Sequence, residues 1–111
     1  MKKFMVLYMA PSADFEKLVS GSTPEGRQAF MDAWMKWMEA NKAAVVDMGA
    51  PLGRTTRVDA KGASAVHNNV GGYSVVQAES AEAAAKLFGK DHPHLAAMPS
   101  AWIELIEIMP M

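Results

Sequence analysis

The chain has 111 residues, of which 50% are apolar and 21% are charged, and its formal net charge is -1. This length suits one domain, covering residues 1-111, with a single modest core, and the composition argues against disorder. The near-neutral charge and the lack of a basic stripe argue against nucleic acid or an anionic membrane as a partner.

Cysteine is absent, which excludes disulfides and thiolate chemistry and suits a reducing, cytoplasmic location. The apolar run from Phe4 to Ala10 has the minimum length of a signal-peptide core, and no convincing cleavage site follows it. No run approaches the ~20 residues that span a bilayer. We therefore expect no membrane association.

Residues 3-10 predict a strand that is apolar on both faces, with Phe4 and Tyr8 on one face and Leu7 on the other. Pro11 ends this strand, and residues 11-22 read as a polar connection. The next element is a long helix from Pro24 to Asp47, which Thr23 can cap and Gly49 can close in a left-handed conformation.

The long helix carries an apolar stripe at helical spacing. The stripe consists of Phe30, Met31, Trp34, Trp37, Met38 and Val45. Trp34 and Trp37 are large enough to roof a pocket, although aromatic residues in such a stripe more often anchor a core. The ten methionines of the chain fit either a loosely specified core or a pliable apolar pocket.

A second, more polar strand is expected over residues 54-59, followed by a tight reversal at Lys61-Gly62. Residues 63-71 are ambiguous, because 65-67 can pair back on the second strand. The third main strand covers residues 73-79, and a short helix capped by Ser80 runs to about Phe88. Residues 101-109 predict the last strand.

The expected order of strand, helix, strand, strand, helix, strand is that of an α+β, ferredoxin-like β-α-β-β-α-β fold with an antiparallel sheet. Its two helices cover only one face of the sheet, yet the first and last strands are apolar on both faces. Monomers rarely expose so large an apolar surface. We therefore expect a homodimer that packs through the open sheet face about a two-fold axis.

The chain resembles the YCII-related family of the dimeric α+β barrel superfamily. The resemblance is carried by the opening strand KFMVLYMA, Thr23-Pro24-Glu25, the turn at residues 49-52, Gly71-Gly72-Tyr73 and His92-Pro93. It implies the ferredoxin-like fold, the dimeric α+β barrel and enzymatic roles on small molecules. The family pattern has a histidine in the first helix and an aspartate directly before the loop proline. Here residues 24-47 contain no histidine, and His92 precedes Pro93, with Asp91 one place earlier.

The loop at residues 90-98 holds the densest cluster of candidate catalytic side chains. His92 and His94 are two residues apart and can project to the same side, and imidazole exchanges protons near neutrality. Asp91 can orient a histidine ring, and Tyr8 or Tyr73 can donate a hydrogen bond to a developing oxyanion. In the structural alternative, His92 hydrogen-bonds the carbonyls that end the second helix, and His94 is exposed to solvent.

Three functions remain open. The first is a small-molecule enzyme of isomerase, lyase or monooxygenase type, with His92, Asp91, His94 and Tyr8 as candidate catalytic residues. The second is a non-catalytic dimer that binds a small hydrophobic ligand, for which the candidate binding residues are Trp34, Trp37, Met38 and Tyr73. The third is an accessory or structural dimer. No cofactor is predicted, because the ligand set for a metal is incomplete and the sequence does not indicate a haem pocket.

Overall fold

The computed structural model describes all residues from 1 to 111. The elements follow the order β1 (Lys2–Met9), α1 (Ser12–Ser20), α2 (Pro24–Ala40), β2 (Val45–Pro51), β3 (Thr55–Asp59), β4 (Gly62–Val66), β5 (Val70–Ala78), α3 (Ala81–Ala85), α4 (Pro93–Ala97) and β6 (Trp102–Ile108). The predicted α+β class with an antiparallel sheet is confirmed.

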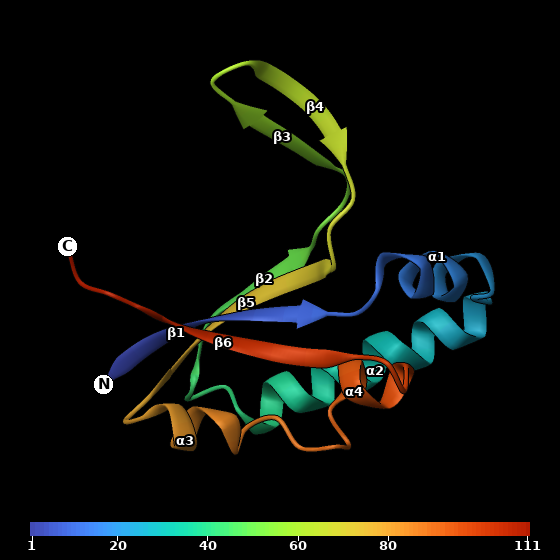
Figure 1. Cartoon of the computed structure of the whole chain (residues 1–111). Coiled ribbons are helices and arrows are strands. Elements are labelled where there is room, and N and C mark those ends of the chain that lie inside the picture. Colours follow the sequence, from blue (N-terminus) through green and yellow to red (C-terminus); the bar gives the residue numbers. More distant parts are fainter.

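The main sheet has four strands in the order β2-β5-β1-β6. The helices α2, α3 and α4 lie on one side of this sheet in Figure 1. The core lies between them and the sheet, where Phe4 and Val6 of β1 pack with Val76 of β5. The alternation predicted for β1 is therefore confirmed, because Phe4, Val6 and Tyr8 are buried beneath the helices while Leu7 points to the other face.

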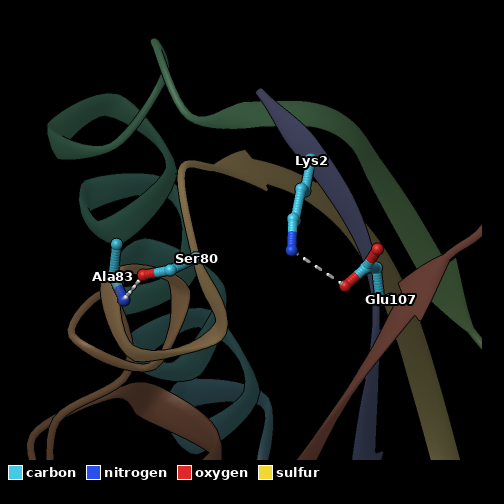
Figure 2. A network of polar contacts seen from close by, with 4 residues as sticks. All are labelled: Lys2, Ser80, Ala83 and Glu107. Carbon is cyan, nitrogen blue, oxygen red and sulfur yellow. Dashed lines mark hydrogen bonds and ion pairs between the residues drawn. The ribbon is translucent and has the colours of Figure 1, made fainter.

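Two helix starts follow their predicted caps. The Thr23 hydroxyl accepts a hydrogen bond from the backbone N–H of Gly26 at 3.0 Å and begins α2. The Ser80 hydroxyl accepts from the N–H of Ala83 at 3.1 Å and begins α3, as Figure 2 shows. In the same figure Lys2 forms an ion pair with Glu107 at 3.5 Å across β1 and β6. This pair is largely exposed, so it contributes little to stability.

The predicted end of the long helix is wrong. The helix ends at Ala40, and residues 45-51 form the edge strand β2 instead of a further helical turn. Val45 and Val46 have the branched side chains that favour strands, and pairing with β5 outweighs the helical spacing of the apolar residues. Gly49 is left-handed as expected, with φ of 71°, but it lies within β2 and does not cap a helix.

Residues 12-20 are also helical, although a polar connection was predicted there. No side-chain cap marks the start of α1, so the sequence signal is weak. Contacts with distant parts of the chain stabilise the helix. The Ser100 hydroxyl donates to the Asp14 carboxylate at 2.6 Å, and Phe15 stacks against His94.

The strand expected at residues 54-59 is not part of the main sheet. It forms β3, which pairs only with β4 in a two-stranded hairpin that we call the arm, residues 55-66. The predicted reversal at Lys61-Gly62 connects its two strands. In Figure 1 the arm rises on the side of the sheet opposite α2, α3 and α4.

Candidate functional site

The histidine loop opens the short helix α4. His92 is the residue before its first turn, and Pro93 provides the fixed backbone angle that suits the first helical position. The Nδ1 atom of His92 accepts a hydrogen bond from the backbone N–H of His94 at 3.1 Å. His92 therefore caps the start of α4 and not the end of α3.

His92 lies in a cage of four aromatic rings, defined here as Tyr8, Trp34, Trp37 and Phe88. Tyr8 is nearly parallel to the imidazole, at 5.6 Å between ring centroids, while Trp34 and Trp37 stand steeply inclined to it, both at 4.8 Å. Only 3% of His92 is exposed. The ring thus works as a core side chain with one polar edge.

The Nε2 atom of His92 is buried and has no hydrogen-bond partner. Because Nδ1 accepts a hydrogen bond, the neutral ring carries its hydrogen on Nε2. The steep inclination of the Trp34 and Trp37 rings to the imidazole is typical of edge-to-face aromatic packing. Burial, and to a smaller extent nearby His94, lowers the pKa of His92 from 6.5 to about 4.

His94 is buried as well, so the structural alternative that exposed it to solvent is wrong. Its Nε2–H donates to the Met9 carbonyl at 2.9 Å, which ties α4 to the end of β1. Burial lowers the pKa of His94, and hydrogen bonding to the backbone of Met9 and Trp102 partly opposes this effect. The side chain is therefore neutral at pH 7.

A cavity of about 300 Å³ lies between α2 and the sheet, and residues of α1 and α4 also line it. Its wall is mostly apolar. The wall residues are Tyr8, Phe15, Leu18, Phe30, Met31, Trp34, Met35, Met38, Met48, Gly49, Ala50, Pro51, Gly71, Gly72, Tyr73, Ser74, His94, Ala97 and Met98. Five of the ten methionines belong to it, and no Asp, Glu, Lys or Arg does.

The polar side chains of the wall include a chain of two hydroxyl groups. The Tyr8 hydroxyl is 2.9 Å from the Ser74 hydroxyl, and Ser74 donates to the Met48 carbonyl at 2.9 Å. Burial raises the pKa of Tyr8 to about 12, and the hydrogen bond to Ser74 opposes this increase. Tyr8 is therefore neutral and holds its proton across the physiological range.

The structure divides the predicted catalytic residues. Tyr8 and His94 line the cavity, whereas His92 lies in the aromatic cage and is not part of the cavity wall. Asp91 is exposed and forms no hydrogen bond or ion pair with either histidine. His92 and His94 both pack against the Tyr8 ring, at 5.6 Å and 5.4 Å between ring centroids, but only His94 is part of the cavity wall.

The predicted binding residues are divided in a similar way. Trp34 and Met38 line the cavity, and Tyr73 also contributes to its wall, although the alternation along β5 places the Tyr73 side chain on the opposite face of the sheet. Trp37 does not line the cavity, because its Nε1–H donates to the Leu87 carbonyl at 2.9 Å and its ring packs on Phe88 and His92. It is an anchor between α2 and the segment after α3.

Sequence reasoning missed Ser74 and Phe15. Ser74 is fully buried in β5, where a lone serine among valines was the one available signal. The position of the Phe15 ring requires a glycine at residue 71, because a Cβ atom at Gly71 would lie 2.3 Å from this ring. Gly71 thus marks the place where α1 packs closely against β5.

No three His, Cys, Asp or Glu side chains gather closely enough to hold a metal ion. No helix combines the length and the apolar character of a membrane-spanning segment. No protein-family model matches this chain, and no curated protein matches it.

Proposed function

We propose that this protein binds a small, uncharged, largely apolar molecule in the cavity between α2 and the sheet. The observation that carries this proposal is the cavity wall, which lines about 300 Å³ without a single charged side chain. Ligand sites of proteins begin at about this size and are lined mainly by apolar residues with few polar groups. Methionine side chains adapt to different ligand shapes, which suits the composition of the wall.

A second candidate is an enzyme that acts on the same molecule. It is favoured by His94, the one histidine of the cavity wall, although burial lowers the pKa of this group below its usual value. His92 and Asp91 do not support this candidate, because the first is outside the cavity and the second is exposed. The binding function needs none of these groups and is therefore the better supported of the two.

Filling the cavity tests the binding function. Ala97 lies in the wall, whereas Ala96 lies next to it on α4 and is exposed. We expect Ala97→Leu to weaken binding of the uncharged dye Nile red at least tenfold and Ala96→Leu to leave it unchanged. Dye fluorescence and quenching of tryptophan emission report the binding. Equal affinity in both variants, or no dye binding by the unaltered protein, would overturn the proposal.

We further propose that the fold is ferredoxin-like and forms a homodimer of the dimeric α+β barrel kind. The strand order β2-β5-β1-β6 supports the first part. The second part is supported by the sheet face opposite the helices, which carries partly exposed apolar side chains along β1, β5 and β6. These are Met5, Leu7, Tyr73, Val75, Trp102, Ile106 and Ile108.

The arm supports the same dimer. Its register places Val58 and Ala63 on one face and Arg57, Asp59 and Ser64 on the other. Val58 is 75% exposed, so the apolar face of the arm is uncovered within one chain. Two-stranded hairpins are marginal by themselves, and the arm rises on the side of the open sheet face (Figure 1). A second copy on that face would lie within reach of the arm.

Light scattering with two matched variants tests the dimer. Ile106 is 49% exposed on the open sheet face, and Val19 is 72% exposed on α1. We expect Ile106→Lys to convert the dimer to monomer at micromolar concentration, whereas Val19→Lys leaves the mass unchanged. A monomeric mass for the unaltered protein would rule out the dimer.

A further inference from the structure

The hydrogen atoms of the two buried hydroxyl groups have only one consistent arrangement. The Met48 carbonyl can only accept, so the Ser74 hydroxyl donates its single hydrogen to it. Since that hydrogen is used, the contact between Tyr8 and Ser74 must be a donation from Tyr8 to the Ser74 oxygen. The order of donation is thus Tyr8 to Ser74 to Met48.

This order fixes what Tyr8 can offer to a molecule in the cavity. Its one hydrogen points to Ser74, so the phenol oxygen has lone pairs to present and no hydrogen. Burial, which raises the pKa of Tyr8, keeps the group from becoming an anion and preserves the arrangement. Toward the cavity, Tyr8 therefore acts only as a hydrogen-bond acceptor.

The rest of the wall suits the apolar part of the ligand. Aromatic rings of Phe15, Phe30 and Trp34 line the cavity together with the methionines. Sulfur and ring edges pack favourably on the face of a flat aromatic molecule. His94 adds no competing donor, because its Nε2–H is already used by the Met9 carbonyl.

We propose that the ligand is an uncharged aromatic molecule with a hydroxyl or N–H group that donates a hydrogen bond to Tyr8, and that the corresponding ether is discriminated against. This inference rests on the proposed binding function and adds its chemical class. The discrimination follows because an ether oxygen placed against the Tyr8 oxygen would leave two acceptors facing each other without a hydrogen.

The matched probes are 2-naphthol and 2-methoxynaphthalene, which differ by one methyl group on the oxygen. Competition with Nile red gives the affinity of each probe, and Tyr8→Phe provides the reference for the intrinsic hydrophobicity of the probes. We expect the preference for 2-naphthol to be about 3- to 10-fold larger in the unaltered protein than in Tyr8→Phe.

Ser74→Ala provides a second, independent test. It removes the acceptor of the Tyr8 hydrogen, so Tyr8 becomes free to donate into the cavity. We expect the preference to shift toward 2-methoxynaphthalene by a similar factor. Circular dichroism and thermal melting confirm that both variants are folded.

The outcomes separate this inference from the proposed function. If both probes bind and the preference is the same in the unaltered protein, Tyr8→Phe and Ser74→Ala, the donor rule is wrong while the binding function stands. If Nile red binds but neither probe competes, the aromatic class is wrong. If neither the dye nor the probes bind, the proposed function fails, and this inference fails with it.

Discussion

Tyr8 lies face to face with His92, with 5.6 Å between the ring centroids and 14° between the ring planes. One face of the tyrosine thus belongs to the core, while its hydroxyl belongs to the cavity wall through Ser74. Core and cavity share Tyr8 and Trp34, so changes at His92 should alter stability first and binding only through these two residues.

The stability of the protein should fall in mild acid. The pKa of His92 is about 4 in the folded protein and 6.5 in the unfolded chain, so the unfolded chain binds more protons between these values. Stability is then complete above about pH 6.5 and decreases as the pH falls toward 4. The full effect corresponds to about 3 kcal/mol.

Urea unfolding at pH 7.5, 6, 5 and 4.5 measures this decrease. His94 acts in the same direction, because burial lowers its pKa too. His92→Phe should reduce the pH dependence of the free energy of unfolding in this range and leave the part that comes from His94. A profile as steep in His92→Phe as in the unaltered protein would assign the effect to other groups.

Substitutions at His92 should separate its two structural roles. His92→Ala removes both the ring from the aromatic cage and the cap of α4, and we expect a loss of about 3 kcal/mol at pH 7. His92→Phe keeps the packing but not the cap, and should cost about 1 kcal/mol. Exposed His67→Ala is the control, expected to change stability by less than about 0.5 kcal/mol. Similar losses in His92→Ala and His67→Ala would contradict the cage.

Gly49 should tolerate no side chain. Its φ of 71° is left-handed, and a Cβ atom there would lie 1.7 Å from the Tyr73 carbonyl oxygen. We expect Gly49→Ala to destabilise the protein by roughly 3 kcal/mol or more, since β2 must move away from β5. Gly53→Ala is the matched control, because its Cβ would meet nothing within 4 Å. Thermal melts that give the same midpoint for both variants would refute the local geometry.

Trp37→Phe should cost about 1 to 2 kcal/mol. The change leaves the Leu87 carbonyl without the indole N–H that reaches it from α2, while most contacts with Phe88 remain. Gln28→Ala removes a hydrogen bond to Asp32 that is exposed on the same helix, and should change stability by less than about 0.5 kcal/mol. Urea denaturation distinguishes the two. Equal, small losses of unfolding free energy in both variants would show that the hydrogen bond from the Trp37 indole to the Leu87 carbonyl does not contribute to stability.

The strands at both ends of the chain were predictable because Phe4 and Ile103 belong to apolar runs with a clear alternation. The strand β2 was not, since Val45 falls at helical spacing after Met38 and only its pairing with Val76 overrides that pattern. The sequence indicated that His92 and His94 matter together. Their different surroundings depend on Trp37 and Phe15, which are distant in the chain, so no local pattern could separate the caged ring from the ring that faces the cavity.

The helix α2 has seventeen residues and not one fully buried side chain. Its apolar stripe forms one wall of the cavity, where Met31 and Met35 are more than half exposed. Segments with few buried contacts open locally at a lower free energy than the core strands do. The stretch of α2 around Met31 and Met35 should therefore open at a lower free energy than β1 and β5, while Trp37 keeps the helix anchored to the Leu87 carbonyl. Under the proposed binding function, a ligand in the cavity should therefore slow amide hydrogen exchange along α2.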